Sequence, residues 1–251
     1  MLLQLPSSIS QLSDEQLYEK YGQQDLEPVT RFDGKELGPC IPSHGIFPIR
    51  LITKEEVELS DAKLMLIDFG ESFAPSKETK YILNTPLNER PPEGRFEGKK
   101  KPFSFPSDIW SLACAIWSLL CQRPLFQTFF PIDDEITCEQ VDALGMLPPE
   151  WWQQWKARGK YFNNDGTPLK QRKRDAWSLD ECFERSTQEP RRERGMVPFE
   201  QDEKEALLVV LRAMLAYKPE DRITVVGVLQ SEWMTKWAMP EYEKVRQMDD
   251  S

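Results

Sequence analysis

The residues best suited to chemistry are Asp68-Phe69-Gly70, which directly follow the short apolar run Leu64-Met65-Leu66-Ile67. An apolar run of this length predicts a strand. A carboxylate at the end of such a strand can hold Mg²⁺ on phosphate oxygens, and the glycine lets the backbone turn away. Asp68 is therefore a candidate metal ligand, although a three-residue pattern is weak by itself.

Four further patterns follow Asp68 in an order and at intervals that strengthen its interpretation as a metal ligand. They are Thr85-Pro86 with Arg90-Pro91-Pro92-Glu93, then Ser107-Asp108-Ile109-Trp110-Ser111, then Arg123-Pro124-Leu125-Phe126, and finally Leu215-Ala216-Tyr217-Lys218-Pro219-Glu220-Asp221-Arg222-Ile223-Thr224. An ordered set of five elements is far more specific than any one of them.

Two other segments resemble catalytic or binding motifs but lack residues that those motifs require. Gly70-Glu71-Ser72-Phe73-Ala74 lacks the last glycine of a hydrolase nucleophile elbow, and the only histidine, His44, precedes the serine instead of following it. The stretch 94–100 imitates a phosphate-binding loop but has three residues between its glycines and Lys100 where Ser or Thr is needed. We interpret 94–100 as a solvated basic turn, and the runs 172–174 and 191–194 as solvated faces.

The elements that must position these residues are mainly helices. Ile109, Leu112, Ala113, Ile116 and Leu120 recur at helical spacing, which predicts a buried helix over 107–120 with Ser107 as its N-cap. Further helices are predicted over 149–159 and 200–217, and one capped by Thr224. Near the start, Ser13 to Gln16 forms a capping-box pattern that Gly22 can close. We expect a loop over 41–45 and a frayed tail beyond Tyr242.

Composition limits the class of protein. The 251 residues suffice for one or two domains, and 8 Trp with 13 Phe can fill a core. A net charge of −10 disfavours nucleic acid as a partner and favours a basic protein. Five cysteines without a Cys-x-x-Cys pair predict reduced thiols in an intracellular protein, cytoplasmic or nuclear. The start lacks a signal peptide, and no stretch is long enough to span a membrane.

The ordered motifs over residues 61–240 resemble the C-terminal lobe of a eukaryotic-type protein kinase. Arg90 before Pro-Pro-Glu is similar to the CMGC group, which contains the cyclin-dependent, MAP and SR-protein kinases. A long segment at about 127–199 fits that group's insert. The amino-acid sequence of 105–114 looks most like that of the SR-protein (serine/arginine-rich protein-specific) kinase relatives. The resemblance implies a mainly α fold around a buried central helix, with a small β element.

The same resemblance implies a role for each matching residue. Asp68, with Phe69 and Gly70, would hold Mg²⁺ on ATP and open an activation segment spanning 68–93. Glu93 would pair with Arg222 and lock that segment to the lobe. Asp108 would brace the catalytic loop from the central helix, which also carries Trp110. Each role has a structural alternative: Asp68 could be a turn aspartate, Asp108 a helix cap, and Glu93 and Arg222 solvated charges.

Several parts of a kinase have no match upstream of Asp68. These are the glycine-rich loop, the ATP-binding lysine and the loop with the catalytic Asp and Asn, and 67 residues cannot hold an N-lobe. Leu2 to Pro6 looks like the strand that follows the catalytic-loop Asn. Residues 7–60 would then be an insertion after that strand, and 1–60 together would form a Pro-rich leader to the lobe. Residues 241–251 would be a tail. We therefore expect no intact catalytic residue and no productive binding of Mg-ATP.

Two hypotheses of different class remain open. In the first, the chain is a truncated or inactive Ser/Thr kinase whose full product phosphorylates serine in Arg/Ser-rich proteins. In the second, it is a non-catalytic C-lobe module that binds basic protein partners. Affinity for Mg-ATP separates them, because a complete kinase needs the nucleotide and a module does not. A hydrolase built on Ser72 has little support.

Overall fold

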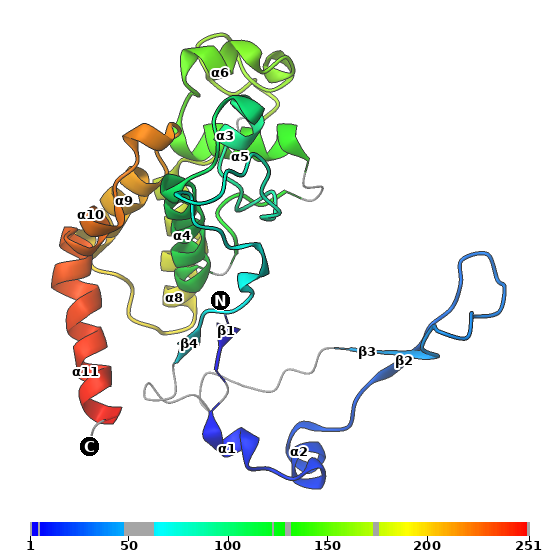
Figure 1. The fold of residues 1–251 in the computed structure, drawn as a ribbon. Helices are drawn as coiled ribbons and strands as arrows, with labels where there is room; N and C mark the ends of the chain where they lie inside the picture. Colours follow the sequence, from blue (N-terminus) through cyan, green and yellow to red (C-terminus); the bar gives the residue numbers. More distant parts are fainter. Residues whose placement is uncertain are drawn as a thin grey trace. The chain divides into compact units, whose positions relative to one another are not determined.

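The chain forms two units that are described separately. The structure, a computed structural model, describes residues 2–4, 6–47, 63–121, 123–128, 132–172 and 176–249. The first unit comprises residues 1–69 with 242–251, and the second comprises residues 70–241. Most of the described elements are helices, with two small antiparallel sheets in the first unit, so the predicted mainly α fold with a small β element is confirmed (Figure 1).

The first unit contains two short strand pairs and two helices. Strand β1 (Leu2–Leu3) pairs antiparallel with β4 (Leu64–Met65), so Leu2 lies opposite Met65. Helix α1 (Ser7–Ser10) follows β1, and β2 (Leu26–Pro28) pairs with β3 (His44–Ile46). The predicted loop over 41–45 is therefore partly wrong, because its last two residues enter a strand.

Helix α2 (Asp14–Tyr21) has the capping that the sequence predicts. The Ser13 hydroxyl accepts a hydrogen bond from the Gln16 backbone N–H, and the Gln16 side chain accepts one from the Ser13 backbone N–H. Gly22, at φ 83°, closes the helix in a conformation that glycine adopts without strain.

The named elements of the second unit, within the described residues, are all helices, joined by long irregular segments. In chain order they are η3 (Phe69–Glu71) at its border, α3 (Glu93–Phe96), η4 (Gly98–Lys100), α4 (Phe105–Leu120), α5 (Asp133–Leu144), α6 (Pro149–Gln154), η5 (Arg158–Lys160), α7 (Leu179–Phe183), η6 (Glu184–Gln188), α8 (Glu189–Glu193), α9 (Gln201–Met214), η7 (Pro219–Asp221), α10 (Val225–Leu229), η8 (Met234–Ala238) and α11 (Met239–Asp249). Helix α11 continues into the residues assigned to the first unit.

The larger core lies where α4 and α9 pack against each other (Figure 1). Trp110 and Ala113 of α4 are fully buried, as are Leu207 and Leu211 of α9. Trp110 stacks on Phe126 with ring centroids 5.7 Å apart. The sequence pattern of 107–120 thus predicts the right buried helix, because its apolar residues point into this core.

A second core is aromatic and lies under α6. Phe96 stacks on Trp151 at 5.4 Å, and Trp152 meets Trp155 edge to face at 5.9 Å. Cys138 of α5 is completely buried in the same cluster. The three close tryptophans therefore serve packing.

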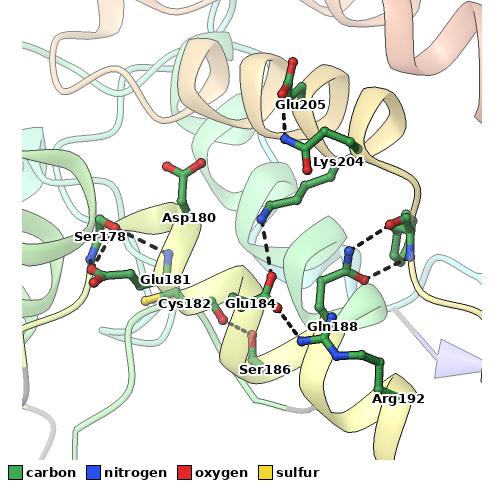
Figure 2. Close-up of polar contacts among 12 residues, drawn as sticks. Ser178, Asp180, Glu181, Cys182, Glu184, Ser186, Gln188, Arg192, Lys204 and Glu205 are labelled. Carbon is green, nitrogen blue, oxygen red and sulfur yellow. Dashed lines mark hydrogen bonds and ion pairs between the residues drawn. The ribbon is translucent and has the colours of Figure 1, made fainter. Parts of the chain in front are cut away.

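The segment before α9 is held to it by polar contacts (Figure 2). Gln188 is buried and exchanges two hydrogen bonds with the backbone of Phe199, at 2.8 and 2.9 Å. Glu184 forms ion pairs with Arg192 and with Lys204 of α9, and Ser178 caps α7 through a reciprocal pair of bonds with Glu181. These bonds fix the π-helical turn η6 beneath α9.

Several predicted boundaries are wrong. Helix α4 begins at Phe105, so Ser107 lies inside it instead of capping it. Helix α6 ends at Gln154, five residues before Gly159, and α9 ends at Met214 instead of reaching Tyr217. Beyond Tyr242, where a frayed tail was expected, α11 continues to Asp249. Thr224 does cap α10, accepting from the Gly227 N–H at 3.2 Å.

Two basic segments are also more structured than expected. The stretch 94–100 is helical in α3 and η4, and Phe96 is buried. Arg172 forms an ion pair at 2.7 Å with Asp142, whose side chain is 4% exposed. Lys173 and Arg174 lie outside the described residues. Within the described part of the chain, no helix is long and apolar enough to cross a membrane.

The packing predicts contrasting effects of two substitutions on α9. Leu211 is fully buried, so Leu211→Ala should lower the free energy of unfolding by about 2–5 kcal/mol. Val209 is 65% exposed, so Val209→Ala should change it by less than about 0.5 kcal/mol. Urea unfolding followed by circular dichroism compares the two. Equal effects would contradict the placement of the core.

Candidate functional site

The centre of the candidate site is a buried ion pair between Glu93 and Arg222. Each residue is 6% exposed. The Arg222 Nη1 donates to Glu93 Oε1 at 2.8 Å, and Nη2 donates to Oε2 at 2.6 Å. The sequence separation is 129 residues. The structure thus brings together the two residues that the kinase resemblance paired.

Every N–H of the Arg222 guanidinium has an acceptor. Besides the two bonds to Glu93, Nε donates to the Ala216 carbonyl at 2.8 Å, Nη1 to the Pro106 carbonyl at 3.0 Å and Nη2 to the Tyr217 carbonyl at 2.9 Å. Five bonds use all five donors that an arginine has. The guanidinium also lies 5.1 Å from the centre of the Trp110 ring. The positive charge is therefore fully compensated although it is buried.

Ser107 adds a further hydrogen bond to the Glu93 carboxylate. Its hydroxyl donates to Glu93 Oε1 at 3.0 Å. Because Ser107 lies in the first turn of α4, this bond joins the start of α3 to the start of α4. Three distant segments, at 93, 106–107 and 216–222, therefore meet at one carboxylate–guanidinium pair.

Arg90 orders the segment that leads to Glu93. Its Nε and Nη2 both donate to the Thr85 carbonyl, at 3.0 and 2.7 Å, and Ser111 of α4 donates to the Glu89 carbonyl at 3.2 Å. Arg90 also lines a surface hollow of about 180 Å³ between this segment and α5. The end of the predicted activation segment is thus fastened to α4 at more than one point.

Asp108 and Trp110 lie in the same helix but in different surroundings. Trp110 is fully buried and contacts both Phe126 and Arg222. Asp108 is exposed, and among the described residues its carboxylate has no hydrogen-bond partner. The structure therefore gives Trp110 a packing role and does not bring Asp108 to a loop that it could brace.

Asp68 and Phe69 end the first unit, and Gly70 begins the second. Asp68 has φ 66°, and it is the only residue other than glycine with a positive φ in the described part of the chain. Aspartate tolerates this left-handed conformation better than most residues because its short side chain can hydrogen-bond locally. All three residues of the Asp-Phe-Gly pattern are exposed.

The described residues do not make a metal site. Mg²⁺ requires about six oxygen ligands in near-octahedral geometry. Within the described ranges, no group of three or more His, Cys, Asp or Glu side chains could hold a metal ion. Asp68 alone supplies one carboxylate. The described donor set therefore does not fit Mg-ATP without further ligands.

The sequence did not predict one polar cluster beside the site. Arg95, expected to be solvated, donates to the carboxylate of Asp134, the Asp133 carbonyl and the Thr137 hydroxyl of α5. Trp155 Nε1 donates to the same Asp134 carboxylate at 2.8 Å. Although burial acts in the opposite direction, these hydrogen bonds lower the pKa of Asp134. No local pattern could have revealed a contact 39 residues apart.

A mainly helical unit in which a buried, bidentate Glu93–Arg222 pair joins two distant segments agrees with the protein kinase resemblance. The family described as "Protein kinase domain" matches residues 51–234, which is most of the chain. The chain therefore belongs to this family, and the kinase resemblance is confirmed.

Two curated relatives are similar to this chain. Serine/threonine-protein kinase SKY1 of Saccharomyces cerevisiae (strain ATCC 204508 / S288c) is 25% identical over 137 residues, which is 53% of this chain and 17% of that protein. Serine/threonine-protein kinase AFC1 of Arabidopsis thaliana is 24% identical over 181 residues, which is 69% of this chain and 35% of that protein. The matched region is thus well under two thirds of either relative.

Breaking the Glu93–Arg222 pair should be costly. Arg222→Ala leaves Glu93 buried without its partner, so we expect the free energy of unfolding to fall by about 3–5 kcal/mol. Arg212→Ala is the matched control, because Arg212 forms an exposed pair with Asp180 whose loss should cost about 0–1 kcal/mol. Denaturant unfolding of both variants measures the difference. A loss below about 0.5 kcal/mol for Arg222→Ala would rule out the anchoring role.

Glu139 of α5 should make stability depend on pH. Burial and the nearby Asp142 charge raise the pKa of Glu139 to about 7, against the partial opposition of Arg172. The folded state therefore binds more protons than the unfolded state between about pH 4.5 and 7, so the free energy of unfolding falls as pH rises through this window.

Glu139→Gln cannot ionise and should remove this fall. Relative to the unaltered chain, the variant should gain about 1 kcal/mol or more between pH 4.5 and pH 8. Urea titrations at the two pH values test this, with the exposed Glu193→Gln as the matched control. A pH-independent difference for Glu139→Gln would show that the carboxyl is not buried as described.

Proposed function

We propose that this chain forms the C-terminal lobe of a Ser/Thr protein kinase related to the SR-protein kinases. The complete active site would transfer phosphate from ATP to serine in Arg/Ser-rich proteins. The observation that carries the proposal is the satisfied Glu93–Arg222 pair at the end of the segment that starts at Asp68. In a kinase, such a segment must be held in place before a substrate can be positioned.

The β1–β4 pair supports the proposed organisation of the first unit. The resemblance puts Leu2 to Pro6 just after the catalytic-loop Asn and the strand ending at Ile67 just before Asp68. Leu2–Leu3 and Leu64–Met65 pair antiparallel, as two strands flanking an insertion would. We propose that 7–60 is this insertion, of which 48–60 lie outside the described residues.

We further propose that the 251-residue polypeptide transfers no phosphate by itself. Phosphoryl transfer depends on positioned reactants and on charges aimed at the phosphate oxygens. The sequence shows no glycine-rich loop, no ATP-binding lysine and no catalytic Asp or Asn motif. A single carboxylate at Asp68 cannot replace them, so Mg-ATP would not be held productively.

The net charge of the chain supports the proposed class of substrate. The chain carries a formal charge of −10, which attracts a basic partner and disfavours nucleic acid or an anionic membrane. Proteins rich in arginine and serine fit this charge. We propose that such partners are met inside the cell, in the cytoplasm or the nucleus.

The second candidate is a non-catalytic module that binds basic proteins. It is favoured by the second unit, whose own core and fully bonded Arg222 require nothing from a nucleotide. The mass of the protein in its native cells distinguishes the two. A species well above 29.3 kDa would support the kinase, and one at 29.3 kDa would support the module.

The proposed inactivity predicts the result of a direct assay. The purified 251-residue chain should not transfer phosphate from ATP to an Arg/Ser peptide, and calorimetry with Mg-ATP should show no saturable binding. An active SR-protein kinase serves as the positive control. Turnover that is abolished in Asp68→Ala but retained in the exposed first-unit variant Asp25→Ala would overturn the proposal.

A further inference from the structure

A groove of about 320 Å³ lies on the second unit between α9 and η8, and it shares no residue with the candidate site. Asp202, Glu205, Ala206 and Val209 of α9 line one wall, and Glu232 and Trp237 line the other. The groove therefore combines carboxylates with apolar and aromatic side chains.

The α9 wall presents one face of the helix. Asp202, Glu205, Ala206 and Val209 stand at positions i, i+3, i+4 and i+7, which share a helix face. Ala206 is 7% exposed and forms the floor, whereas Val209 is 65% exposed. Seven residues at 1.5 Å each separate the acidic end from the apolar end by about 10 Å.

The other wall already holds one cation. Lys236 lies in the π-helical turn η8, a type of turn frequent at functional sites. Its ammonium pairs with Glu232 at 2.5 Å and lies 5.9 Å from the centre of the Trp237 ring. The bond from Glu232 raises the pKa of Lys236, and the charge of Asp202 adds to this from across the groove.

Lys236 does not neutralise the groove. Three carboxylates line it against one ammonium. In the described part of the chain, Glu205 accepts a hydrogen bond from the neutral Gln201 at 2.6 Å, and Asp202 has no ion pair. Two negative charges therefore remain next to an exposed valine and a tryptophan. An anionic surface would be repelled, while a cationic side chain would be attracted.

We propose that this groove docks a basic segment of a partner protein. One Arg or Lys of that segment pairs with Asp202 and Glu205, and an apolar side chain covers Val209 and Trp237. In a segment with polyproline II conformation, which has three residues per turn, residues i and i+3 share a face and lie about 9 Å apart, close to the 10 Å between the two ends. The partner motif is therefore a basic residue followed three positions later by an apolar one. The proposal uses no residue of 68–93 and does not depend on phosphoryl transfer.

Fluorescence anisotropy tests the charged end. The probe is a labelled ten-residue peptide with one arginine and, three positions later, one leucine in a glycine–serine background. The double variant Asp202→Asn, Glu205→Gln should weaken binding about fivefold, because it removes two exposed charge contacts. The matched control Glu193→Gln removes an exposed carboxylate of α8 and should leave affinity unchanged. Equal loss in both would overturn the proposal in favour of unspecific attraction.

Two further variants test the rest of the groove. Val209→Ala should weaken binding of the leucine peptide but not of one with alanine in its place. Lys236→Ala should strengthen binding about twofold, because it frees Glu232 and removes a competing cation. No saturable binding of the peptide, or weaker binding to Lys236→Ala, would overturn the proposal. These readouts require no nucleotide, so they stay separate from the kinase assay.

Discussion

The buried pair between Glu93 and Arg222 is the constraint on which the rest of the second unit depends. A guanidinium and a carboxylate each lose several kcal/mol of hydration when buried, so they are tolerated only with complete hydrogen bonding. Here that requirement draws in Ser107 and the carbonyls of residues 106, 216 and 217. Satisfying one charge pair therefore fixes the start of α3, the start of α4 and the turn before η7 relative to one another.

The hydrophobic core and this polar anchor support each other. Trp110 lies against the Arg222 guanidinium on one side and Phe126 on another, so it excludes water from the ion pair and fills the core beside α9. The same helix, α4, fastens the end of the 68–93 segment through Ser111 and Glu89. A helix of the core thus holds the end of this segment through its backbone.

The second unit offers two surfaces of different chemistry. The hollow beside Arg90 is formed by the segment before α3 together with α5, whereas the groove at α9 is acidic and partly apolar. Arg90 and Arg95 line the first, whereas Asp202, Glu205 and Glu232 line the second. The charges of the two surfaces therefore differ, although they belong to the same unit.

The sequence by itself determined the local features: the capping of α2 by Ser13 and of α10 by Thr224, the buried face of α4, and the ordered motifs that mark a protein kinase. These depend on residues within a turn or two of each other, or on a fixed order along the chain. Ser107 shows where local reasoning fails, because its hydroxyl could equally cap a helix or donate to a distant carboxylate. Only the tertiary structure decided that it donates to Glu93, that Arg95 and Arg172 are paired with α5, and that α9 and η8 enclose an acidic groove. The reason is physical: a polar side chain is solvated or buried according to neighbours that here lie 14 to 39 residues away, and nothing in the local pattern encodes them.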